Sequence, residues 1–303
     1  IAPDNAAYCW GDNTSGQLGD GTTSNRQTPQ RLPGTYNTIS ASAFHTCAIA
    51  TDERAYCWGD NNVGQLGDGT IDQRLDPTAV AGGLRFKSIS TGGFHTCAIA
   101  LDDRGYCWGN NSQGRLGDGT TEHRLQPVEV SGGHRFSVLR AGNGYSCGIT
   151  TGGDAFCWGL NDNGRLGDGT TEDRPVPTLV AGGHRFASLD VGGAHNCAIT
   201  TDGAAYCWGF NAFGQLGDAS NTDSPVPVAV VDGFTFSDIA ASNRHSCATT
   251  PKRVLYCWGS NASGELGTGG TENHNRPIRV AHPADSSPPS ASAPASPVPE
   301  RIR

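Results

Sequence analysis

The chain has 303 residues and a formal net charge of −8, with 21 Lys and Arg against 29 Asp and Glu. This acidic balance excludes a chain-wide basic surface for nucleic acid or anionic lipid. No apolar run approaches the roughly 20 residues that a membrane-spanning helix needs. We therefore expect no nucleic-acid partner and no membrane span.

A repeat of about 50 residues organises the sequence. The tripeptide Cys-Trp-Gly occurs six times and uses all six tryptophans, with its cysteine at Cys9, Cys57, Cys107, Cys157, Cys207 and Cys257. Self-similarity at this period is typical of architectures in which one supersecondary unit is repeated.

Within one unit, residues 84–130, the pattern predicts four strands in chain order. Residues 85–90, 95–100, 105–108 and 126–130 alternate in polarity and are separated by turns or by a glycine-rich loop. Pro127 suits an outer edge strand. Four antiparallel strands per unit predict an all-β fold, a β-propeller of about six blades over residues 1–280, with very little helix.

The cysteines indicate how two strands of each blade pair. Five pairs are ten residues apart: Cys47/Cys57, Cys97/Cys107, Cys147/Cys157, Cys197/Cys207 and Cys247/Cys257. Directly opposed hairpin positions lie at a distance that a disulfide spans, so we predict five disulfides. Zinc is the alternative, but two cysteines supply only half of a tetrahedral site. Disulfides in this number predict a secreted or cell-surface protein.

Of the 11 cysteines in the chain, Cys9 is the one that lacks such a partner. Its unit contains only the third and fourth strands, so the sequence predicts five complete blades and an N-terminal half-blade. An unpaired sheet edge is normally covered, and Cys9 is therefore expected to be unpaired or intermolecular. Three explanations remain open: a longer precursor carries the missing hairpin, another chain completes the blade, or copies of this chain meet there.

Residues 281–303 differ in composition from the repeats, with six Pro, five Ser and five Ala. Such a composition favours an extended tail, either a linker or an arm that docks on a neighbouring subunit.

Positions that vary between the repeats are candidates for partner binding. They are Phe44, Phe94, Tyr145, Phe210, Phe213 and Arg244. Aromatic side chains on loops anchor interfaces, although they also pack within their own chain.

Polar residues that recur have a structural explanation. A histidine two residues before the cysteine (His45, His95, His195 and His245) is expected to cap a turn or to bond the backbone of a neighbouring blade, the alternative being a metal ring. The recurring loop aspartates, such as Asp68, do not follow calcium-loop spacing and are expected to bond loop backbone. No cofactor, metal or catalytic motif is expected, and the protein is not predicted to be an enzyme.

The segments His95-Thr96-Cys97-Ala98-Ile99, Tyr106-Cys107-Trp108-Gly109 and 114–120 resemble the repeat of the regulator-of-chromosome-condensation family. The resemblance covers residues 6–280 and implies a β-propeller, for which that family typically has seven blades. It also implies protein binding: one type exchanges nucleotide on a small GTPase, and a secreted bacterial type inhibits β-lactamases. This chain departs from the pattern in its fewer units and its blade cysteines.

Together these features predict an exported, non-enzymatic structural or adhesive subunit that self-assembles through its half-blade and tail. The alternative is an inhibitor or binding module that docks a partner through variable loops of one face.

Overall fold

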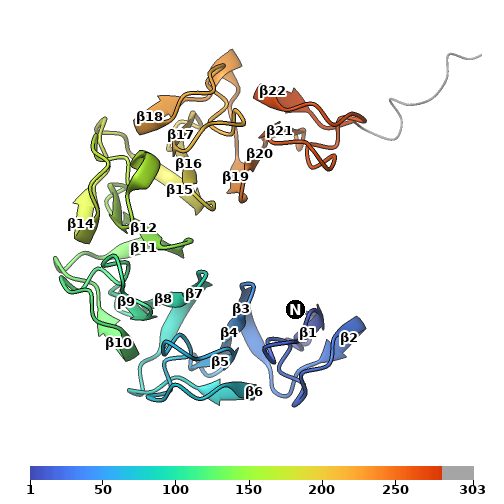
Figure 1. The fold of residues 1–303 in the computed structure, drawn as a ribbon, viewed down its shortest axis with the longest axis vertical. Coiled ribbons are helices and arrows are strands. Elements are labelled where there is room, and N and C mark those ends of the chain that lie inside the picture. The colour runs from blue at the N-terminus through green and yellow to red at the C-terminus, as the bar shows by residue number, and fades with distance from the viewer. Residues whose placement is uncertain (282–303) are drawn as a thin grey trace, which may run out of the picture.

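The computed structural model describes residues 1–281, which form strands, turns and loops. One two-stranded and five four-stranded antiparallel sheets follow one another around an open arc, with half-blade 1 and blade 6 at its ends (Figure 1). This arrangement confirms the predicted all-β propeller. Within residues 1–281, helix is limited to two three-residue 3-10 turns, Asp162–Gly164 (η1) and Val231–Gly233 (η2). The predicted tail, beyond Ala281, lies outside the described residues.

The strands are numbered in chain order, and each blade runs from an inner to an outer strand. Half-blade 1 contains β1 (Tyr8–Gly11) and β2 (Arg26–Arg31). Blade 2 contains β3 (Tyr36–Ala41), β4 (His45–Ala50), β5 (Ala55–Gly59) and β6 (Arg74–Ala79). Blade 3 contains β7 (Phe86–Thr91), β8 (His95–Ala100), β9 (Gly105–Gly109) and β10 (Arg124–Glu129). Blade 4 contains β11 (Phe136–Ala141), β12 (Tyr145–Thr150), β13 (Ala155–Gly159) and β14 (Arg174–Leu179). Blade 5 contains β15 (Phe186–Val191), β16 (His195–Thr200), β17 (Ala205–Gly209) and β18 (Ser224–Ala229). Blade 6 contains β19 (Asp238–Ala241), β20 (His245–Thr249), β21 (Leu255–Gly259) and β22 (His274–Arg279).

The hairpin register in each blade follows side-chain size. In blade 3, Cys97 lies opposite Cys107 and Thr96 lies opposite Trp108, so a small residue accompanies a large one. The outer strand β10 begins two residues before the predicted segment, because Arg124 pairs with Gly109 across an irregularity in the ladder. The alternating pattern of the sequence does not reveal such an irregularity.

All five predicted cysteine pairs are disulfides. Their Cα atoms are 4.0–4.1 Å apart, because each pair occupies directly opposed positions of the second and third strands. Each bridge thus fastens the hairpin at the centre of its blade.

The core lies between blades, where a tryptophan of one blade packs on the long loop of the preceding blade. Trp58, Trp108, Trp158, Trp208 and Trp258 are fully buried. The Nε1 of Trp108 donates to the carbonyl of Gln65, 3.0 Å away. A Cβ on Gly67, which has φ +70°, would lie 2.6 Å from that Nε1, so the close approach requires glycine. The Gly-Xaa-Leu-Gly segment therefore accepts the indole of the next blade, and we call this segment the receptor loop.

Candidate binding surfaces

The inner edge of β1 carries no strand among residues 1–281, because β1 pairs only with β2. In blades 2–6 the equivalent edge is paired with a strand that carries the partner cysteine. Cys9, the free cysteine of the described residues, is half-buried at this edge. Burial raises the pKa of the Cys9 thiol, and the positive charge of the chain's first amino group acts in the opposite direction.

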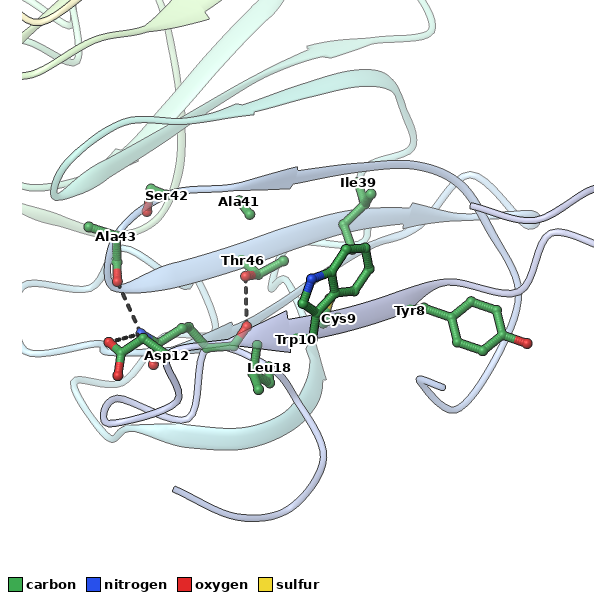
Figure 2. Close-up of a pocket in the computed structure, with 11 residues that line it drawn as sticks. Tyr8, Cys9, Trp10, Asp12, Leu18, Ile39, Ala41, Ser42, Ala43 and Thr46 are labelled. Carbon is green, nitrogen blue, oxygen red and sulfur yellow. Dashed lines mark hydrogen bonds between the residues drawn. The ribbon is translucent and has the colours of Figure 1, made fainter. Parts of the chain in front are cut away.

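Trp10 is the one tryptophan of the repeat that is not buried: it is 58% exposed. Together with Cys9 it lines a pocket of about 460 Å³ between β1 and the inner strand β3, which contributes Ile39 (Figure 2). The lining is mainly apolar, with Leu18 beside these residues. Gln17 also lines the pocket, and its Nε2 donates to the carbonyl of Ala43. The pocket occupies the inner side of the half-blade.

His45, His95 and His195 each contact the following blade, but through a side-chain hydroxyl and not through the backbone that the sequence predicted. His45 Nε2 lies 2.9 Å from Thr96 Oγ1, whose hydroxyl donates to the carbonyl of Gln65. That carbonyl also accepts Trp108 Nε1. Because Thr96 uses its proton on Gln65, the imidazole donates, and burial lowers the pKa of His45 to about 3. His95 and His195 bond Ser146 and Ser246 of the following blades in the same way.

Blade 6 ends this series with the receptor loop Gly264–Gly267. No tryptophan or hydroxyl of residues 1–281 donates to the carbonyl of Glu265, and Gly267 is exposed, whereas Gly67 is buried. Among residues 1–281, one end of the arc therefore presents a tryptophan without a receptor loop, and the other end presents a receptor loop without a tryptophan.

The recurring aspartates bond within their own loops. Asp68 accepts the backbone N–H of Thr70 at 2.9 Å and pairs with Arg74 Nε at 2.7 Å. Hydrogen bonds from Thr70 and Arg74 lower the pKa of the Asp68 carboxyl against the opposing effect of burial. The predicted backbone-bonding role is confirmed at this position.

Five of the six predicted partner-binding side chains lie on one face of the propeller, here called the long-loop face. It is formed by turns 42–44, 92–94, 142–144, 192–194 and 242–244 and by loops 60–73, 110–123, 160–173, 210–223 and 260–273. Phe44 stacks on Phe94 with ring centroids 5.3 Å apart. Phe213 contacts Phe210 edge-on. The Arg244 guanidinium lies over the Phe213 ring, with its Cζ atom 5.1 Å from the ring centroid.

Tyr145 is a correction to that set, because it lies in the core. It is fully buried, and its hydroxyl donates to the carbonyls of Gly192 and His195 at 3.1 and 3.0 Å. Tyr145 replaces the recurring histidine in holding the next blade.

Three residues of these surfaces were not predicted from the sequence: Trp10, which is more exposed than any of its repeats, and two buried arginines, Arg115 and Arg165. The sequence contains a feature that distinguishes Trp10 and another that distinguishes the two arginines. Within residues 1–281 no Gly-Xaa-Leu-Gly segment comes before Trp10, and the arginines stand where other repeats have glutamine.

A family profile of the RCC1-like domain matches residues 1–293. The chain belongs to the RCC1-like domain family. Its fold is similar to that of human WBSCR16, with a TM-score of 0.81 and 21% identity over 91% of this chain and 76% of that one. It is also similar to yeast RCC1 (Prp20) bound to Kap60, with a TM-score of 0.82 and 20% identity over 94% of this chain and 72% of that one.

A third RCC1-like structure, Prp20p from Saccharomyces cerevisiae, gives a TM-score of 0.81 at 21% identity, covering 94% of this chain and 74% of that one. Prp20p has binding properties toward Gsp1p and histones. No curated protein matches the sequence significantly. In residues 1–281 no helix is long and apolar enough to cross a membrane.

Proposed function

We propose that this RCC1-like protein is an exported, non-enzymatic propeller that binds other polypeptides through its half-blade. One observation carries the proposal: Trp10 and Cys9, whose five repeats are buried and disulfide-bonded, line an apolar pocket at an unpaired sheet edge. Exposed strand edges and exposed aromatic side chains are features of protein-binding surfaces.

The five disulfides support export, because such bridges persist in oxidising compartments. The RCC1-like structures support a binding role, since yeast RCC1 is seen bound to Kap60. A catalytic role lacks support: the titratable groups with the largest pKa shifts, such as His45 and His195, are used to join blades.

The first binding mode is self-assembly, with copies joined head to tail. Trp10 of one copy would enter the receptor loop Gly264–Gly267 of the next and donate to the carbonyl of Glu265. This contact repeats the one that Trp108 and Trp258 make within the chain. Because donor and receptor lie on different surfaces, the contact is heterologous and generates rings or filaments. A structural or adhesive role would follow.

Sedimentation analysis between 1 and 100 µM tests self-assembly. We expect the wild-type chain to associate and Trp10→Ala to remain monomeric. Ile71→Ala is the matched control, since Ile71 is an apolar side chain that is 60% exposed on another loop. Association of Ile71→Ala with wild-type affinity completes the expected result. A wild-type chain that is monomeric throughout this range contradicts self-assembly.

The second binding mode is the docking of a partner on the long-loop face, and the aromatic pairs there favour it. Phe210 and Phe213 are replaced mainly by small or polar residues in the other repeats. Phe210→Ala with Phe213→Ala should abolish capture of a specific partner while leaving self-association intact. An unchanged set of captured proteins contradicts this mode.

A further inference from the structure

One position of the receptor loop varies in charge between repeats. It is the residue before leucine in Gly-Xaa-Leu-Gly, namely Gln17, Gln65, Arg115, Arg165, Gln215 and Glu265. Gln17 and Gln65 each donate through Nε2 to an aspartate five residues earlier, Asp12 and Asp60, at 2.9 and 2.8 Å. A carboxylate therefore accompanies this position in half-blade 1 and blade 2.

Blades 3 and 4 have arginine at this position and no carboxylate five residues earlier, where Asn110 and Leu160 stand. Arg165 is 5% exposed and pairs with Asp162. Arg115 is 7% exposed and forms no ion pair with the described residues; its Nη2 donates to the amide oxygen of Gln113. The Nε of Arg115 is buried and has no hydrogen-bond partner.

An unpaired buried guanidinium destabilises a fold, because the charge loses hydration without gaining a counter-charge. Burial accordingly lowers the pKa of Arg115, and Asp173 acts weakly in the opposite direction. Glutamine fits the same position in three repeats, so the fold itself does not require a cation there.

Arg115 and Arg165 line the same hollow, which has a volume of about 590 Å³ and opens on the long-loop face. Three asparagines, Asn110, Asn143 and Asn243, lie around it, and their amide groups are hydrogen-bond donors. No Asp or Glu is among the residues that line the hollow. Asp162 is paired with Arg165, so the guanidinium of Arg115 is the cation of this lining that lacks an ion-pair partner among the described residues. A lining of this kind is complementary to a negative charge.

We propose that this hollow binds an oxyanion, a carboxylate or phosphate group, on the guanidinium of Arg115, with the asparagines as further donors and Arg165 as a nearby positive charge. The group could belong to a free small anion or to an acidic side chain of a partner on the long-loop face. The site is separate from the half-blade, so its failure would leave the proposed self-assembly untouched.

The test is calorimetric titration and thermal unfolding with inorganic phosphate, succinate or a glutamate-rich peptide, each against sodium chloride of equal ionic strength. The key variant is Arg115→Gln, which introduces the residue that three other repeats already have. We expect it to weaken binding at least tenfold and to raise the unfolding temperature without anion. Arg115→Lys should weaken binding less, since lysine keeps the positive charge but lacks the planar guanidinium that binds an oxyanion through two N–H groups.

Arg31→Gln is the matched control, because it removes one exposed arginine far from the hollow. It should bind as the wild type does. Saturable binding of phosphate or succinate assigns a free anion, and binding of the peptide alone assigns a partner's side chain. Equal effects of every salt on wild type and Arg115→Gln, or no saturable binding by any of the three probes, overturn the proposal.

Discussion

Replacing Trp208 and Trp10 separately by alanine compares a closed blade contact with an open one. Burying an entire indole removes about 200 Å² from water, which stabilises the fold by about 5 kcal/mol. Trp208 is fully buried and its Nε1 donates to the carbonyl of Arg165, 3.2 Å away, which adds about 1 kcal/mol. Trp208→Ala should therefore lower the free energy of unfolding by about 5–6 kcal/mol, an upper estimate.

Trp10 is 58% exposed and has no hydrogen bond from its indole among residues 1–281, so Trp10→Ala should lower stability by at most about 2 kcal/mol. The assay is urea unfolding at 1 µM, where self-association is weakest, followed by both fluorescence and circular dichroism. Comparing transition midpoints avoids assuming that a repeat protein unfolds in two states. Equal losses for the two variants would refute the reasoning, because they would mean that Trp10 is buried in solution.

Three further predictions follow from the same contacts. Thiol labelling of the native, unreduced protein at pH 7 should modify Cys9 alone, and more slowly than a free cysteine, since burial raises the pKa of the Cys9 thiol. Labelling of further cysteines, measured by intact mass, would contradict the presence of the five disulfides. The pKa values of His45 and His195 are lowered to about 3, so the unfolded chain binds protons that the folded chain does not, and stability should fall between pH 6.5 and 3. At pH 5 each histidine should lower stability by about 2 kcal/mol, and His45→Gln should reduce the measured pH dependence. Gly67→Ala should be more destabilising than Gly83→Ala in the same urea assay, because both have φ near +70° but only Gly67 faces an indole; equal losses would assign the whole effect to backbone strain.

Much of the fold follows from the sequence because each unit repeats the same constraints. The opposition of Cys97 to Cys107 and the place of Pro127 on an outer strand both follow from local alternation and hairpin geometry. The burial of Tyr145 does not, because its hydroxyl donates to the carbonyls of Gly192 and His195, which lie 47 and 50 residues away in the next blade. Only the placement of the next blade shows that this tyrosine replaces histidine as a donor.

The candidate sites were harder to predict for a related reason. Cys9 stands out in a sequence because cysteines are counted in pairs. Trp10 and Arg115 are defined by partners that other repeats have and these residues lack, so their roles appear only when the interblade contacts are known. Conversely, the aromatic residues of the long-loop face stand out in the sequence because they break the repeat.

Trp58, Trp108, Trp208 and Trp258 each donate a hydrogen bond to the long loop of the preceding blade, and this shared contact makes the blades that carry it interchangeable. Blades 2 and 5 each carry an indole donor on one flank and a carbonyl acceptor on the other, so such a unit inserted into or removed from the middle of the array would find matching neighbours. Changing the number of blades therefore alters the curvature and size of the disc without requiring a new contact.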